Sequence, residues 1–439
     1  MDTITQLEGW TTEIAAAGQQ LASYCRQNGV DGGQPPQLVV PADAPRAIQQ
    51  TRRLLLRNLD HLRTLLSEPS DLVARLAGAT QQLACLHWLG EFQVLACLPR
   101  TGSVPIADLA RLANVPEAQL ARIIRFTSSS AGFLQETPPG HVAHSPLSRA
   151  VGHRASLRDA LGFLAATAAP GALHMSSSAT PDDPGVEARP SPSFSFYAAC
   201  DQQPKLHRRW SAYLQHTGAD PSDLARQVLA RVDWFNLNKT CVVEIVGPQC
   251  STPTAVTLAQ LHPELHFIVQ VVQIPTSHHH HHPGSEEKIR VPPRMEMQLQ
   301  RRELGTPQRL VRDTTLYVLN LHPLPPAVFA GAVRAELHAH LRVLATNRRA
   351  TLIVVAGLLL PDPGGPAVDA TVAATVRLHD LTLLQLAHQG LLGEAELVAL
   401  VHSVGDSAGG RLVVMHRLPL PQAATVALGV KYQEPGGLG

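Results

Sequence analysis

The sequence is poor in aromatic and charged residues. Phe, Trp and Tyr together make up 4% of its 439 residues, and Asp, Glu, Lys and Arg make up 16%. The 36 basic residues almost balance the 35 acidic ones, so the formal net charge is only +1. A nearly neutral chain lacks the basic excess that favours binding to nucleic acid or to an anionic membrane surface. The composition therefore predicts neither partner, and its many aliphatic residues indicate a buried, helix-rich core.

Cysteines are few and scattered, and long apolar runs are missing. The six cysteines form no CxxC pair, which is typical of reduced thiols and predicts a cytoplasmic protein. The opening stretch MDTITQLEGW has neither a basic n-region nor an apolar h-region, so we expect no secretory signal. The longest apolar run, ATLIVVAGLLL at 350–360, is about half as long as a membrane-spanning helix requires. We predict that it forms a buried strand.

The first 150 residues have the pattern of a helical and winged-helix domain. Apolar residues recur at helical spacing in 46–66, and 104–136 predicts a helix, a turn and a second helix. The segment GHVAHSPLSRAV at 140–151 follows as a short wing. The second helix contains only two arginines, Arg122 and Arg125, so we favour a dimerisation or lid module over a DNA-binding one.

Beyond this domain the pattern changes twice. Residues 151–235 are mostly helical. Residues 236–439 alternate strands with helices, which predicts a doubly wound α/β domain with a mostly parallel sheet and helices on both faces. Ligands of such sheets bind beyond the carboxyl ends of the strands.

Several stretches together resemble the S-adenosylmethionine-dependent O-methyltransferases of the plant and fungal small-molecule type. LARIIRF and GHVAHSPLSRAV resemble the winged-helix dimerisation domain of that family. CVVEIVG resembles its first strand, LYVLNLHPL the strand that carries its catalytic histidine, and LIVVAGLLLPDPG a later strand. The resemblance covers most of 80–435. It implies the methyltransferase fold, a homodimer formed through residues 1–150, and a substrate-lining role for the helical region 151–235.

The departures from the family lie where its cofactor binds. The family has three glycines in the first loop, whereas this chain has Val246, Gly247 and Pro248. Val271 stands where the family has an acid for the ribose hydroxyls. We therefore regard Glu244, Gly247 and Val271 as a degenerate cofactor site, and we predict that no cofactor is required and that S-adenosylmethionine binding is weak or lost.

His322 and His174 are the candidate catalytic residues. The resemblance places His322 where the family has a histidine that deprotonates the substrate, and an imidazole serves as acid or base near neutral pH. His174 lies in the stretch that lines the substrate side in the family. The alternative for both is an ordinary histidine without a catalytic role, because the chain has 22 histidines.

An aromatic group is the candidate wall of an apolar substrate pocket. Ordinary core packing is the alternative. The residues are Phe163, Phe194, Phe196, Tyr197, Trp210 and Tyr213.

The run of five histidines from His278 to His282 invites a metal interpretation. Consecutive residues cannot all face one ion, and no acid or cysteine completes the shell. We predict a low-complexity loop and no metal site.

A methyltransferase fold with a degenerate cofactor loop resembles the O-methyltransferase-like pericyclases. The resemblance implies a cofactor-independent pericyclase and dehydratase of natural-product biosynthesis. Such an enzyme dehydrates a pyridone or polyketide-derived alcohol to a quinone methide and directs an Alder-ene or hetero-Diels–Alder cyclisation. Two alternatives remain open: an O-methyltransferase of a phenolic or polyketide substrate, and a non-catalytic partner in the pathway.

Overall fold

The computed structural model divides into two compact units. One unit comprises Met1–Leu173 and Lys205–Tyr213, and the other comprises His174–Pro204 and Leu214–Gly439. The three-part division at 150 and 235 stays a prediction. The structure describes residues 2–29, 40–41, 43–130, 132–137, 139–175, 192–217, 227, 229–230, 232, 240–247, 254–262, 264–273, 297–311, 314–321, 324, 326–361, 369–420 and 425–436.

The first unit begins with long helices. Helix α1 (Thr3–Gln27) packs against α2 (Arg46–Leu66), and α1 buries Ala17, Leu21 and Cys25, which recur every four residues on one face. Helix α3 (Pro69–Glu91) begins at a proline, and the Asp71 carboxylate accepts the backbone N–H of Glu68 at 2.9 Å. Proline and an acid in the first turn both favour a helix start.

A winged-helix arrangement follows. A three-stranded sheet in the order β1-β3-β2 accompanies α5 and α6. The core between them is apolar and includes Leu109, Leu120, Ile124 and Phe133. The elements of this part are α4 (Val94–Cys97), β1 (Ser103–Pro105), α5 (Ile106–Leu112), α6 (Glu117–Ser129), β2 (Leu134–Glu136), β3 (His141–His144) and α7 (Pro146–His153).

The rest of this unit is helical. Helix α8 continues into a π-helical turn, η1, in which each hydrogen bond spans one residue more than in an α-helix. The elements are α8 (Ala155–Phe163), η1 (Leu164–Ala168), α9 (Ala169–Leu173) and α11 (Pro204–His216).

The second unit is built on a seven-stranded sheet in the order β6-β5-β4-β7-β8-β10-β9. The first five strands in this order are parallel, and β10 runs antiparallel to both β8 and β9. The strands are β4 (Cys241–Val246), β5 (His266–Gln273), β6 (Met297–Glu303), β7 (Thr314–Asn320), β8 (Thr351–Ala356), β9 (Arg411–Leu420) and β10 (Thr425–Gln433).

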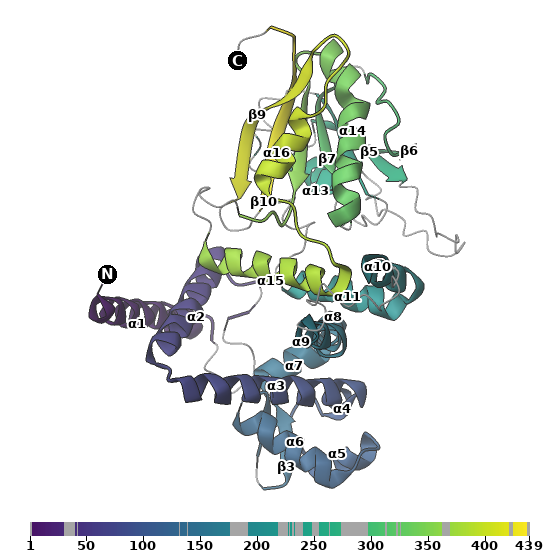
Figure 1. Ribbon diagram of the computed structural model, residues 1–439. Coiled ribbons are helices and arrows are strands. Elements are labelled where there is room, and N and C mark those ends of the chain that lie inside the picture. The colour runs from purple at the N-terminus through teal and green to yellow at the C-terminus, as the bar shows by residue number, and fades with distance from the viewer. Residues whose placement is uncertain are drawn as a thin grey trace, which may run out of the picture. The chain divides into compact units, whose positions relative to one another are not determined.

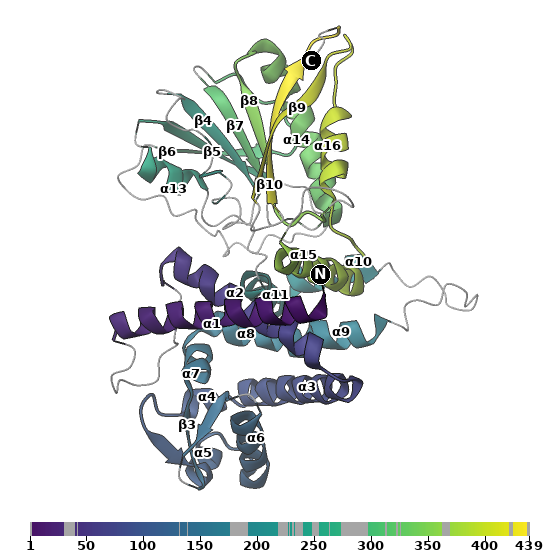
Figure 2. The same ribbon diagram turned by 90° about the vertical axis from the view of Figure 1, so that its left-hand side faces the viewer.

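Helices cover both faces of this sheet (Figures 1 and 2). Helices α14 and α16 pack with Val243 and Ile245 on one face, whereas α13 packs with Val242 and Val246 on the other. Helix α15 packs against α10. The helices are α10 (Pro192–Gln202), α13 (Thr254–Leu261), α14 (Pro326–Thr346), α15 (Ala370–Ala387) and α16 (Glu394–His402).

The predicted fold class is confirmed: a mostly parallel, doubly wound sheet accompanies a helical N-terminal unit. Two strands, β6 and β10, were not expected. In β6 the edge position leaves Gln298, Leu299 and Gln300 exposed, so the strand lacks the apolar run of a buried strand. Among the described helices, none combines the length and apolar character needed to cross a membrane.

Candidate functional site

A ligand of this fold would bind at the carboxyl ends of the parallel strands. Val246 at the end of β4 pairs with Val271 of β5 on one side and with Asn320 of β7 on the other. Val271 in turn pairs with Arg301 of β6. The sheet therefore brings the predicted cofactor residues Glu244, Gly247 and Val271 together near the carboxyl ends of β4 and β5.

Glu244 holds the beginning of helix α13. Its two carboxylate oxygens accept the backbone N–H groups of Thr254 at 3.1 Å and Ala255 at 2.6 Å, and the Asn320 amide donates at 3.4 Å. The side chain is buried, and this burial raises its pKa, although these hydrogen bonds lower it in part. A helix N-terminus attracts anions, and here the anion is the protein's own carboxylate.

Gly247 lies close to the end of the neighbouring strand. A Cβ atom added at this position would stand 3.2 Å from the carbonyl oxygen of Leu321. The backbone of Leu321 thus occupies the space beside Gly247, so the lack of a side chain there accommodates the protein itself. The adjoining positions 248–253, including Pro248, lie outside the described residues.

Val271 is half-buried and has no hydrogen-bonding side-chain atom to offer a ribose hydroxyl. Glu244 is hydrogen-bonded to the start of α13, and Gly247 lies against the backbone of Leu321. The described residues at these strand ends therefore do not fit a binding site for S-adenosylmethionine. That no cofactor is required stays a prediction.

The two candidate catalytic histidines differ in what the structure describes. His322 lies outside the described residues, directly after Leu321, which is fully buried at the end of β7. His174 follows α9 and is exposed. Their catalytic roles stay predictions.

The predicted aromatic group is distributed over both units. In the first unit, the Phe163 ring lies 5.2 Å from the ring of Trp210 and 5.1 Å from that of Tyr213, and all three are buried. In the second unit, Phe196 and Tyr197 meet edge to face at 5.3 Å. Phe194 belongs to α10, and its side chain is outside the description. The contacts are those of packed aromatic clusters, and a role in substrate binding stays a prediction.

A buried polar cluster between strand β6 and helix α14 was not predicted from the sequence. Glu336 on α14 pairs with Arg302 and accepts the backbone N–H of Gly305 at 3.0 Å. His340, one turn later, contacts the Glu336 carbonyl oxygen at 2.7 Å. Burial lowers the pKa of His340 to about 4, and the charge of Arg302 acts in the same direction. The four-residue spacing of Glu336 and His340 is the signal that places both on one helix face.

His338 lies on the opposite side of α14 and is exposed, as its two-residue offset from His340 predicts. Within the described part of the chain, no three His, Cys, Asp or Glu side chains come together in a way that suits a metal ion. The run from His278 to His282 lies outside it.

Comparison with curated proteins identifies full-length relatives. The chain is 57% identical to the trypacidin cluster transcriptional coactivator tpcD of Aspergillus fumigatus over 99% of this chain and 98% of that protein. It is 35% identical to the monodictyphenone cluster transcriptional coactivator mdpA of Emericella nidulans over 99% of both chains. A family model described as the tpcD N-terminal domain matches residues 4–67, which contain most of α1 and α2.

Solved structures share the fold at low sequence identity. The crystal structure of OxaC superposes with a TM-score of 0.62 at 15% identity, covering 98% of this chain and 100% of that one. A variant of LepI in complex with SAH and a substrate analogue superposes with a TM-score of 0.59 at 16% identity, covering 89% and 97%. The mitomycin 7-O-methyltransferase MmcR gives 0.55 at 16%, covering 83% and 98%. These neighbours are enzymes on the same O-methyltransferase fold.

The predicted pericyclase and dehydratase function is wrong. The relatives that match the whole chain at 35–57% identity are named for transcriptional coactivation, whereas the enzymes share only the fold. The error came from inferring chemistry from a scaffold, and one fold hosts many functions.

Proposed function

The chain belongs to the family of biosynthetic-cluster transcriptional coactivators that includes tpcD, and from this we propose that it is itself a coactivator of a natural-product gene cluster. The full-length identity of 57% to tpcD carries the proposal. In this function the methyltransferase fold serves as a scaffold for protein contacts.

The sheet edge supports a scaffold role. The Glu244 carboxylate, which is buried, stabilises the start of α13, and Gly247 lies against the backbone of Leu321. Both residues thereby contribute to the fold without a ligand. The nearly neutral chain favours action through a DNA-bound activator protein over direct contact with DNA.

We place the contact with that activator on α2 and the first half of α3. Helix α2 buries Asn58, whose side-chain amide donates to the carboxylate of Glu13 on α1. Its leucines Leu56, Leu59 and Leu66 are exposed. On α3, Leu72, Val73 and Leu76 are exposed as well. Large exposed apolar surfaces mark protein interaction sites.

The activator is the occupant that we favour, because the family model of these coactivators covers 4–67, which contains α2. An apolar helix face most readily accepts the apolar face of an amphipathic helix. The proposal therefore expects the activator to present such a helix.

Gene deletion with complementation tests the proposal. We expect deletion to lower the transcripts of the neighbouring biosynthetic genes, and both the wild-type gene and a His322→Ala variant to restore them. The enzyme alternative predicts that transcripts persist after deletion while the metabolite disappears. That result, or a failure of His322→Ala to restore transcription while the protein accumulates normally, would overturn the proposal.

A further inference from the structure

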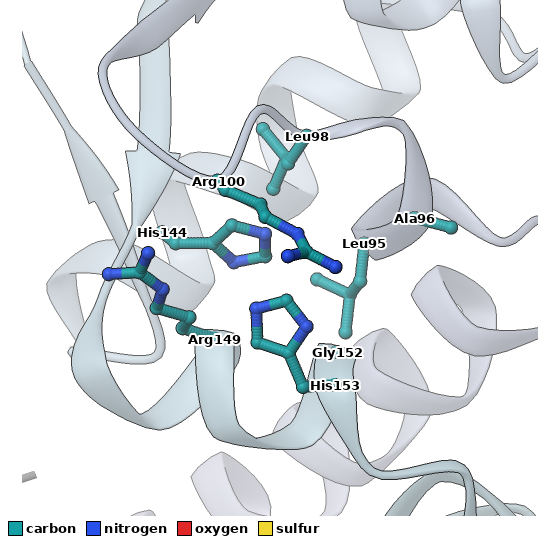
Figure 3. A pocket seen from close by; sticks show the side chains of 8 residues that line it. All are labelled: Leu95, Ala96, Leu98, Arg100, His144, Arg149, Gly152 and His153. Atoms are coloured by element: carbon teal, nitrogen blue, oxygen red, sulfur yellow. The ribbon is translucent and has the colours of Figure 1, made fainter. Parts of the chain in front are cut away.

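A cavity of about 160 Å³ in the winged-helix part is surrounded by basic side chains (Figure 3). It lies between α4, the end of β3 and α7. Four of its eight lining residues are basic and none is acidic. The lining residues are Leu95, Ala96, Leu98, Arg100, His144, Arg149, Gly152 and His153.

The basic groups converge although they come from separate segments. Figure 3 shows Arg100, His144 and His153 directing their nitrogen-bearing ends towards one another, while Arg149 extends past the other side of His144. Within the described part of the chain, neither Arg100 nor Arg149 forms an ion pair. Like charges gathered without a counter-ion repel each other, so an anion among them would be stabilising.

The neighbouring basic groups affect the pKa of His144. Its ring is buried, and its Nδ1 lies 3.0 Å from the Ser148 hydroxyl. Burial lowers its pKa, the positive charges of His153 and Arg149 lower it further, and the Leu95 carbonyl raises it. Together with the two arginines that form no ion pair in the described part of the chain, this indicates an excess of basic groups around the cavity.

The donors define the class of ligand. Guanidinium and imidazole groups donate hydrogen bonds to oxyanions. A metal ion would meet two imidazoles but also two guanidinium charges, which oppose it. A nucleic-acid backbone presents a row of phosphates to an exposed surface, whereas this cavity admits one small group. We propose that the cavity is a binding site for a phosphate-class oxyanion, either free phosphate or a phosphate monoester.

Calorimetric titration with inorganic phosphate at low salt and pH 6.5 tests the site in the full-length protein. Wild type should bind saturably. Arg100→Gln and His153→Gln each replace one basic hydrogen-bond donor at an exposed position, and we expect each to weaken binding about tenfold. Arg122→Gln, at an exposed arginine of α6 outside the lining, should leave the affinity unchanged.

A second titration, with phosphoserine, identifies the chemical form of phosphate that the cavity prefers. Tighter binding of phosphoserine than of inorganic phosphate would assign the site to a phosphorylated side chain or metabolite, and equal binding to the free ion. Unchanged circular dichroism and melting temperature would show that each variant folds. The proposal fails if wild type shows no saturable binding, if Arg122→Gln loses as much affinity as Arg100→Gln, or if duplex DNA alone binds.

Discussion

The carboxylate of Glu244 accepts the backbone N–H of Ala255 at 2.6 Å, so the first parallel strand holds the start of the helix that follows it. Eleven positions separate the two residues in the chain. In a cofactor-binding version of this fold, a helix N-terminus at this place is suited to an anionic ligand group. Here the carboxylate of Glu244 occupies that position, and its contribution to stability can be tested.

Glu244→Ala should destabilise the second unit. The substitution leaves the N–H groups of Thr254 and Ala255 buried without their acceptor, which costs about 2–4 kcal/mol of unfolding free energy. Glu244→Gln keeps one acceptor oxygen and should cost less. Urea unfolding measures both. As a control, Glu434→Ala removes an exposed partner of Arg348 and should change stability by less than about 1 kcal/mol. An unaltered midpoint for Glu244→Ala would contradict the capping role.

Stability should fall below neutral pH because of His340. The pKa of His340 in the folded protein is about 4, below the ordinary value of about 6.5 for an unfolded chain. The unfolded chain therefore binds the extra proton between these values. The contribution is fully present above about pH 6.5 and is lost as pH falls towards 4, amounting to about 3 kcal/mol. Arg302, Glu336 and Tyr317 face the ring.

Urea unfolding between pH 5.0 and 7.5 checks this slope. His340→Leu should flatten it, because the titrating group is gone. His338→Gln, which changes an exposed histidine two residues earlier on the same helix, should leave it unaltered. Identical slopes in wild type and His340→Leu would rule out His340 as the source.

Transcription should depend on the exposed leucines of α2. Replacing Leu59 and Leu66 by Ser removes apolar side chains that are 45% and 66% exposed. If they lie at the centre of the activator contact, affinity should fall about tenfold, and cluster transcripts measured by quantitative PCR should fall with it.

A matched control exists within the same unit. Leu112 and Leu147 are 66% and 47% exposed, and like Leu66, Leu112 is the last residue of its helix. The double Ser variant at these positions should retain transcription. Equal loss in both double variants would point to a general effect and would remove α2 as the contact.

S-adenosylmethionine should leave the melting temperature unchanged. A ligand stabilises the folded state in proportion to the logarithm of its concentration over its Kd, so 1 mM cofactor bound at 10 µM would contribute about 2.7 kcal/mol. We expect a shift of less than about 1 °C because Glu244, Gly247 and Val271 provide no cradle. A methyltransferase that binds the cofactor serves as the positive control. A shift of several degrees here would show that the edge of the sheet still binds it.

The fold could be predicted to a large extent from apolar runs. Strands β4, β7 and β8 are buried on both faces, and their continuous Val, Leu and Ile residues mark them in the sequence. Strand β6 is polar because it pairs only with β5 at the edge, so no such run marks it. Strand β10 was missed although it is buried, because its apolar run lies beside β9 without an intervening helix.

The candidate site was less predictable than the fold. Val246 and Val271 lie side by side because the carboxyl ends of parallel strands meet, whereas the assignment of Glu244, Gly247 and Val271 to a degenerate cofactor site stays a prediction. The partners of Glu244 depend on which backbone N–H groups begin α13, and a sequence pattern defines a helix end only to within one or two residues. Function was mispredicted because loss of cofactor residues is shared by enzymes without cofactors and by proteins without catalysis.

By itself, the sequence determined the layers of this protein, because burial of apolar side chains leaves a helical period in the helices and continuous apolar runs in the central strands. It also determined the degenerate loop, which is a matter of residue type alone. Only the tertiary structure decided which polar groups meet. Arg100, His144 and His153 converge on one cavity, and Arg302 reaches Glu336, across 34 to 53 positions of chain. Hydrogen bonds and close ion pairs form only over a few ångströms, so such groups make a site only after the packing of the elements has brought them together.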